Sequence, residues 1–165
     1  MEILQELKVT NGLMKQGGST VECNPDGVRR KELRMLRKEG VNRLSIGAQG
    51  ANDDIRRLIG RRHNWRQVEM AVKRARKAGF RNVSLDLIYG LPSQTREDWA
   101  DTLTKALALK PAHISCYGLR LEAGTPMYAE YEGTDIIPSD EEQADMYLSA
   151  AGLLSRQRFR PNGTS

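Results

Sequence analysis

Four polar residues stand near the ends of short apolar runs that have the composition of β-strands. Glu22, Gln49, Asp86 and Tyr117 each occupy a late position in such a run. A buried carboxylate is costly unless it is paired, so two carboxylates near one set of strand ends indicate contact with a polar ligand. The alternative is that neighbouring Arg or Lys side chains pair with Glu22 and Asp86 inside the fold. Ligand contact is favoured, because packing alone is a weaker explanation for several polar groups gathered at one set of strand ends.

No other arrangement of side chains in the sequence has the spacing of a known catalytic or metal site. The two histidines, His63 and His113, lack metal-ligand spacing, and neither a phosphate-binding glycine loop nor a G-x-S-x-G turn occurs. Cys23 and Cys116 each lie in an apolar run, where a thiol usually behaves as a small buried hydrophobe. We therefore assign no catalytic residue and no metal ligand from the sequence.

These side chains need a framework of alternating strands and helices. Apolar runs bounded by turn residues predict strands at 20–23, 43–49, 82–89 and 113–119. Amphipathic spacing with capping residues predicts helices at 2–8, 28–39, 53–59, 64–78, 95–109 and 139–154. Residues 124–126 are expected in a loop that leads to the last helix. Four successive strand–helix units favour parallel strands joined by right-handed crossovers.

Alternation gives the second and third predicted strands one apolar and one more polar face. In residues 43–49 the even positions are apolar and the odd ones include Ser45 and Gln49, whereas in 82–89 the even positions include Ser84 and Asp86. A polar face suits the lumen of a barrel better than an open doubly wound sheet. We predict an α/β fold, a partial (β/α) barrel arc of about four parallel strands truncated at both ends. Residues 1–154 would form it, followed by an irregular tail at 155–165.

The net charge of +5 lies largely on predicted helical faces, in residues 29–31 and 73–77. No aromatic residues interleave with these basic residues, so they predict solvated surfaces and no nucleic-acid partner. A nucleic-acid-binding half-barrel, the alternative, rests on the charge alone. Neither a membrane-spanning run nor a signal peptide is recognisable, and a cytoplasmic protein without a membrane partner is expected.

Three strings carry a resemblance to a known family: VECNP at residues 21–25, GVNRLSIGAQ at 40–49 and DLIYGLPSQT at 86–95. In order and spacing they resemble the core of the oxygen-independent coproporphyrinogen III oxidase family of radical S-adenosylmethionine (SAM) proteins, including its HemW-type heme-chaperone branch. The similarity extends from about residue 2 to residue 154, well under half of a full-length member.

The resemblance implies a partial (β/α) barrel in which a [4Fe–4S] cluster, held by three cysteines in C-x-x-x-C-x-x-C, cleaves SAM. The radical so formed removes hydrogen from a propionate of coproporphyrinogen III. By motif, Glu22 resembles the carboxylate that contacts SAM, Gln49 and Arg61 resemble polar residues lining the SAM region, and Asp86 resembles the carboxylate completing it. The alternative for Arg61 is an outer-face charge. Tyr117 is added to the predicted cofactor-binding set from its strand position.

Several departures from the family pattern limit what is expected of this chain. The C-x-x-x-C-x-x-C motif is absent, and Ala51 stands where the family often has an aromatic residue. Three thiolates at close spacing are required, so the cluster is not expected to assemble and the chain alone is expected to be inactive. Residues 120–126 resemble the E-P-G-T-P segment of HemW-type proteins more than the oxidases.

Two functional hypotheses remain open. The first is part of a radical SAM oxidoreductase acting on porphyrinogens in heme biosynthesis. The alternative is a HemW-like heme-binding protein or a SAM-binding module without catalysis. Porphyrinogen or heme is therefore the expected partner, and open sheet edges predict self-association.

Overall fold

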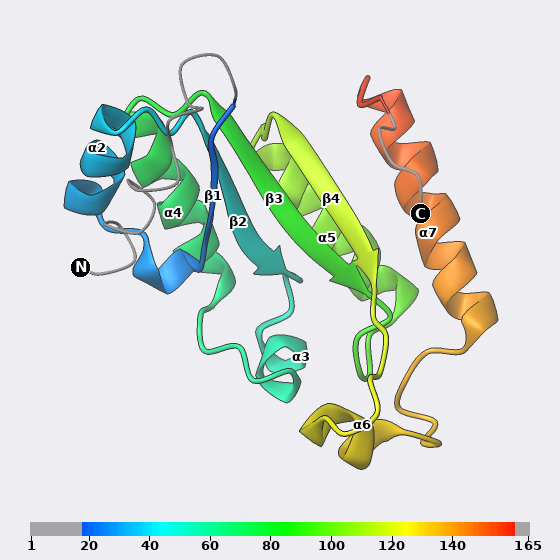
Figure 1. Ribbon diagram of the computed structural model, residues 1–165. Coiled ribbons are helices and arrows are strands. Elements are labelled where there is room, and N and C mark those ends of the chain that lie inside the picture. The colour runs from blue at the N-terminus through cyan, green and yellow to red at the C-terminus, as the bar shows by residue number, and fades with distance from the viewer. Residues whose placement is uncertain (1–17, 161–165) are drawn as a thin grey trace.

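In the described part of the chain, four parallel strands form a single sheet in chain order (Figure 1). The structure, a computed structural model, describes residues 18–160. The strands are β1 (Thr20–Cys23), β2 (Arg43–Gln49), β3 (Asn82–Tyr89) and β4 (His113–Gly118). The predicted bounds are confirmed for the first three, and the fourth ends one residue earlier than predicted. The helix predicted at residues 2–8 lies outside the described residues.

The helices predicted within residues 18–160 are present with small shifts at their ends. The helical elements are η1 (Pro25–Gly27), α2 (Arg30–Lys38), α3 (Asp53–Leu58), α4 (Trp65–Lys77), α5 (Arg96–Ala108), α6 (Pro126–Tyr131) and α7 (Asp140–Arg156). The last helix continues two residues beyond its expected end, and the division at residue 154 stays a prediction.

Three of these helices begin at capping boxes that the sequence signals. Asn64, Thr95 and Ser139 each accept a hydrogen bond from the backbone N–H three residues later. The side chain three residues after the cap accepts in turn from the backbone N–H of the cap residue. Two otherwise unpaired donors are thus satisfied at each helix start. These reciprocal bonds explain why α4, α5 and α7 begin where the spacing predicts.

The loop predicted at residues 124–126 is present as far as Thr125, and a short helix that was not predicted follows it. Residues 126–131 form α6, which begins because Thr125 Oγ1 accepts from the Tyr128 backbone N–H at 3.2 Å. Pro126 occupies the first turn, where its missing N–H costs no hydrogen bond. The Gly and Pro residues at 124–126 are typical of loops, whereas here they precede and open a short helix.

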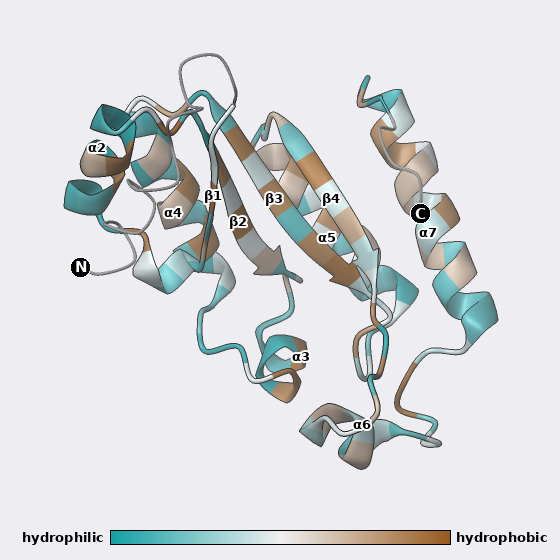
Figure 2. Ribbon diagram, in the orientation of Figure 1, coloured by the Kyte–Doolittle hydropathy of each residue, from teal (hydrophilic) through white to brown (hydrophobic). Residues whose placement is uncertain are grey.

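The hydrophobic core lies between one face of the sheet and the helices packed against it. Figure 1 shows α4 and α5 behind the sheet and α7 alongside β4. Figure 2 shows apolar segments along the strands and on parts of the helices. The core-facing residues at the centre of the sheet, such as Leu44, Ile46 and Leu85, are fully buried. The buried Trp99 of α5 donates from Nε1 to the Met146 carbonyl at 2.8 Å, which ties α5 to α7.

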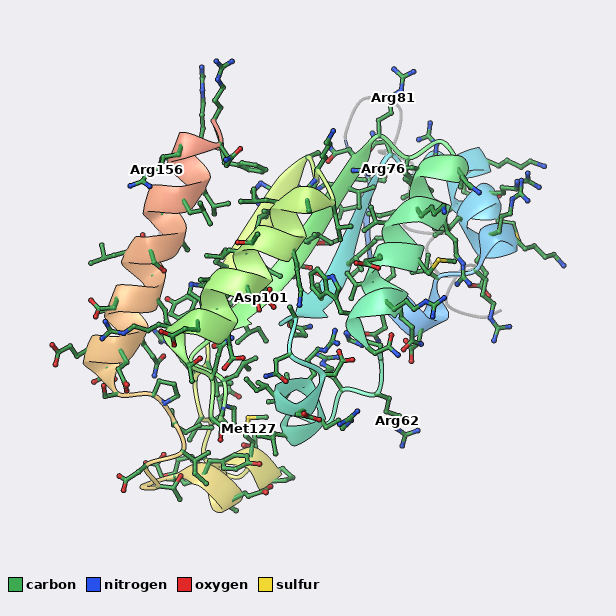
Figure 3. All side chains as sticks on the ribbon, turned by 180° about the vertical axis from the view of Figure 1, so that it is seen from behind. Arg62, Arg76, Arg81, Asp101, Met127 and Arg156 are labelled. Carbon is green, nitrogen blue, oxygen red and sulfur yellow. The ribbon has the colours of Figure 1, made fainter. Side chains whose placement is uncertain are left out.

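The basic residues on α2 and α4 lie on outer surfaces, as predicted for 29–31 and 73–77. Arg62, Arg81 and Arg156 likewise project away from the ribbon (Figure 3). Within residues 18–160, no helix is long and apolar enough to cross a membrane.

Candidate functional site

The more polar face of the sheet is the one turned away from α4 and α5. Parallel pairing places Glu22 opposite Ser45 and Ser45 opposite Ser84, and in the next row Gly47 opposite Asp86. Because residues paired in register point to the same side of a sheet, these positions share one face. The alternation in the sequence therefore has its predicted structural outcome in β2 and β3.

Asp86 is held on this face by a neighbouring hydroxyl. Ser45 Oγ donates to Asp86 Oδ2 at 2.7 Å, and the oxygens of Ser45 and Ser84 are 3.2 Å apart. Arg43 Nε donates to Ser84 Oγ at 3.3 Å. Ser45 and Ser84 are both buried, whereas Asp86 is half-buried. One carboxylate oxygen is thus anchored by the protein itself.

Gln49 reaches the same face through an unusual backbone. It follows an irregularity in the pairing of β2 with β3, has a φ of +63° and is 7% exposed. A Cβ added to Gly47 would lie 2.8 Å from Gln49 Nε2, so the amide lies over the space that the glycine leaves. Left-handed backbone at a non-glycine residue is strained, and such strain gathers at ligand sites. The local fold thus turns the Gln49 amide back toward the row of Asp86.

The other three predicted residues lie around this pair. Glu22 is exposed in β1, and Arg61 Nη1 donates to Asn24 Oδ1 at 3.3 Å, just after β1. Tyr117 is 56% exposed in β4, opposite Ile88 near the carboxyl end of the sheet. The Gln49 amide therefore lies over Gly47, the register partner of Asp86. Glu22 lies one row earlier on the sheet, opposite Ser45, and Tyr117 lies one row later, opposite Ile88. Arg61 lies beside Asn24, after the end of β1.

The internal ion-pair alternative for the two carboxylates is not seen in the described part of the chain. Within residues 18–160, neither Glu22 nor Asp86 has a Lys or Arg nitrogen within 4.0 Å. The nearest anchoring group of Asp86 is the neutral hydroxyl of Ser45. Both carboxylates are consequently available as acceptors for a ligand's hydroxyl or ammonium groups.

SAM fits the donor and acceptor set of this face. Two carboxylates, an amide and a phenol provide acceptors for ribose hydroxyls and an ammonium group. The guanidinium of Arg61 can form a bidentate pair with a carboxylate such as that of the SAM amino acid. The predicted residues therefore include donors and acceptors of the kinds that the groups of SAM can use.

An iron–sulfur cluster does not fit the residues of this chain. The whole sequence holds two cysteines, and burial raises the pKa of Cys23 to about 11 and that of Cys116 to about 12. Thiolates are the cluster ligands, and high pKa values disfavour them. In the part of the chain that the structure describes, no three His, Cys, Asp or Glu side chains are grouped to hold a metal ion. The residues present therefore support no chemical step that depends on a cluster.

A second buried polar cluster lies beside α3, where the sequence predicts none. The Arg56 side chain is fully buried and pairs with Asp53, yet its Nε and Nη1 have no partner among residues 18–160. His63 is 5% exposed, and its Nε2 likewise lacks a partner among the described residues. Burial is the main cause that lowers the pKa of both groups, to about 10 for Arg56. The run Arg56-Arg57 carries no signal of burial, since charge runs usually face water.

The sequence prediction did not assign Ser45 and Ser84 to the site, although their hydroxyls take part in the hydrogen bonds around Asp86. Their alternate positions in β2 and β3 were the available signal, because period-two spacing sets them on the face of Asp86. Their hydrogen bonds could not be anticipated, since these depend on the register between the two strands.

Comparison with known proteins identifies the family. Residues 1–106 match the Radical SAM superfamily. The heme chaperone HemW of Bacillus subtilis is 41% identical over 128 residues, which are 77% of this chain and 34% of the relative. HemW of Synechocystis is 37% identical over 149 residues, covering 90% of this chain and 36% of the relative. Coproporphyrinogen III oxidase, anaerobic 1, of Cereibacter sphaeroides is 30% identical over 98% of this chain and 36% of its own length.

A solved structure supports the same assignment. The coproporphyrinogen III oxidase HemN of Escherichia coli, described as a radical SAM enzyme, superposes with a TM-score of 0.86 at 28% identity. The match covers 99% of this chain and 38% of that one, and it confirms the predicted α/β arc of the partial barrel. The chain spans about a third of the length of the curated relatives it matches. By sequence and by fold, this chain belongs to the radical SAM superfamily.

Proposed function

We propose that this chain provides a SAM-binding wall, with Asp86 and Gln49 at its centre and Glu22, Arg61 and Tyr117 around them. The observation that carries the proposal is the Asp86 carboxylate, which is anchored through one oxygen and has no cationic partner among the described residues. A half-buried carboxylate left in this state is suited to accept from a ligand.

Each residue has a part in binding. Asp86 and Glu22 accept from the ribose hydroxyls or the ammonium group of SAM, and the Gln49 amide can both donate and accept. Arg61 pairs with the SAM carboxylate and so fixes the amino-acid end of the molecule. When bound, SAM is the source of the radical chemistry of this superfamily; these residues hold and orient it. Because the chain has only two cysteines, we propose that it is catalytically inactive alone.

For the function of the whole protein, the heme-chaperone branch is the first candidate. Relatives named heme chaperone HemW show 41% and 37% identity, against 30% for the relative named coproporphyrinogen III oxidase. The segment at residues 120–126 also resembles the HemW type. Heme is then the proposed partner, in the cytoplasmic setting expected from the sequence.

The oxidase branch is the second candidate, favoured by the TM-score of 0.86 with coproporphyrinogen III oxidase HemN. In that case a porphyrinogen is the partner of the whole protein. Self-association through the edge strands β1 and β4 and the lack of a nucleic-acid partner remain predictions for either branch.

Isothermal titration calorimetry with SAM tests the binding proposal. We expect saturable binding by the wild-type chain and a loss of at least about tenfold in affinity for Asp86→Asn, since a charge-assisted hydrogen bond is removed. The matched control is Asp101→Asn, because Asp101 is an exposed aspartate that pairs with Lys105 on α5 (Figure 3). Equal affinities of the two variants, or no heat with the wild type, would contradict the proposal.

The branch and the catalytic state need separate measurements. Titration with hemin, followed by its Soret band, should show saturable binding if the heme-chaperone branch applies, and an unchanged spectrum would count against it. Reconstitution with iron and sulfide should give no stable cluster and no SAM cleavage. A stable cluster that cleaves SAM would overturn the proposed inactivity of the chain.

A further inference from the structure

A directed chain of hydrogen bonds crosses the polar face from Arg43 to Asp86. A carboxylate only accepts, so the single hydroxyl hydrogen of Ser45 goes to Asp86 Oδ2 at 2.7 Å. The Ser45 oxygen is then left as an acceptor, and Ser84 Oγ lies 3.2 Å away as its donor, with the Leu44 carbonyl at 3.3 Å as the competing acceptor. The Ser84 oxygen in turn accepts from Arg43 Nε at 3.3 Å. With the Ser84 hydrogen directed to Ser45, each hydroxyl donates toward the carboxylate and accepts from the cationic end.

From this geometry we infer that Ser45 is a positioning residue: it fixes the Asp86 carboxylate so that Oδ1 is presented to the ligand. The inference rests on the proposed function, because it assigns a role to Ser45 in the SAM-binding wall. Ser45 does not itself contact the ligand. It acts through Asp86, supported by the buried hydroxyl of Ser84.

The hydrogen bond from Ser45 restricts the rotation of the carboxylate. Rotation about the terminal bond of an aspartate has a broad, two-fold profile, so an unanchored carboxylate samples many orientations. Asp86 is half-buried, while Ser45 is 7% exposed and Ser84 is fully buried. A short hydrogen bond to a charged oxygen from such a sheltered donor is stronger than one in water. With Oδ2 held, the orientation of Oδ1 is set before the ligand arrives.

A purely structural role for Ser45 is the rival explanation. In that case the hydroxyl would serve only to satisfy a half-buried carboxylate, and its removal would change stability without a specific effect on ligand affinity. The two roles differ in how Ser45 and Asp86 combine. A residue that acts through Asp86 has no further effect once the carboxylate has been replaced.

The experiment measures SAM affinity by calorimetry for Ser45→Ala, Ser45→Thr and the control Ser115→Ala. Ser115 is the register partner of Asp86 on β4, and no hydrogen bond joins the two among the described residues. We expect about a tenfold loss for Ser45→Ala, near wild-type affinity for Ser45→Thr because it keeps the hydroxyl, and less than about a twofold change for Ser115→Ala. Equal losses in Ser45→Ala and Ser115→Ala would overturn the inference.

Two further readouts separate this inference from the proposed function. In an Asp86→Asn background, Ser45→Ala should change affinity by less than about twofold, and the same tenfold loss in both backgrounds would show that Ser45 does not act through Asp86. Crystal structures of the wild type and Ser45→Ala should show the carboxylate rotated in the variant. If the wild type binds no SAM, the proposed function fails. If the carboxylate orientation is also unchanged in the Ser45→Ala crystal structure, the inference is overturned as well.

Discussion

Two buried polar clusters of this chain differ in how completely they are hydrogen-bonded. On the polar face of the sheet, Arg43, Ser84 and Ser45 form a continuous chain of donors that ends at Asp86. Beside α3, Arg56 pairs with Asp53 but keeps two nitrogens without partners among the described residues. The first cluster joins β2 to β3, whereas the second depends on a short helix and the loop that follows it.

The difference shows what each cluster contributes to the free energy of the fold. Buried polar groups with complete hydrogen bonding specify a geometry, whereas unpartnered ones carry their full desolvation cost. The polar face can therefore present an oriented carboxylate at little cost in stability. The α3 cluster is expected to lower the stability of the fold and to leave ligand affinity unchanged.

The largest expected effect is on stability, from Asp53→Ala. Removing this carboxylate leaves the fully buried Arg56 charge without a counter-ion, so the free energy of unfolding should fall by about 3 kcal/mol. Urea unfolding followed by circular dichroism measures it. Asp54→Ala is the matched control, since Asp54 forms an exposed pair with Arg57 at the same spacing and should cost less than about 1 kcal/mol. Equal losses in the two variants would remove the distinction between the clusters.

Gln49→Gly is expected to separate affinity from stability on the polar face. Glycine adopts the φ of +63° without strain, so the free energy of unfolding should change by less than about 1 kcal/mol. Loss of the amide should weaken SAM binding about tenfold, as measured by calorimetry. A large loss of stability with unchanged SAM affinity would assign Gln49 a structural role instead.

Arg56→Met should make the protein more stable. An apolar side chain of similar length removes the unpartnered nitrogens, while Asp53 remains partly exposed and still accepts from the Trp65 N–H at 3.0 Å. A gain of about 1 kcal/mol in the free energy of unfolding is expected, with SAM affinity unchanged within about twofold. A loss of stability would mean that the guanidinium contributes more through its pairing than it costs through burial.

The smallest effect is a pH dependence at His63. Burial, and next the charge of Arg56, lowers the pKa of this ring in the folded protein. Above about pH 6.5 the ring is neutral in both states; below it the unfolded chain takes up the proton first, so stability falls as pH falls. Between pH 7.5 and 5.5 the free energy of unfolding should therefore fall less in His63→Gln than in the wild type. The difference between the two decreases should be under about 1 kcal/mol. An identical decrease in both proteins would exclude His63 as the cause.

Much of this framework could be predicted because it depends on local spacing. Period-two alternation predicted the bounds of β2 and β3 and the shared face of Asp86, and capping pairs such as Asn64 with Gln67 located helix starts. The cysteine count alone limited what cofactor the chain could hold. These signals lie within a few residues of one another in the sequence.

What could not be predicted depends on contacts between distant segments or on local context that overrides composition. The bond from Ser45 to Asp86 spans 41 positions and needs the register of two strands. Burial of Arg56 contradicts the usual exposure of arginine, and nothing in the run Arg56-Arg57 distinguishes the buried side chain from the exposed one. The helix α6 was missed because Pro126 can open a helix as well as a turn.

The polar face of the sheet is, in our central claim, the surface that binds SAM. Titration of the 15N-labelled chain with SAM, followed by two-dimensional NMR of its backbone amides, tests this claim most directly. We predict saturable shifts concentrated around Gln49 and Asp86 and spreading toward Glu22 in β1. Shifts confined to the basic outer surfaces of α2 and α4, or no shifts at saturating SAM, would contradict it.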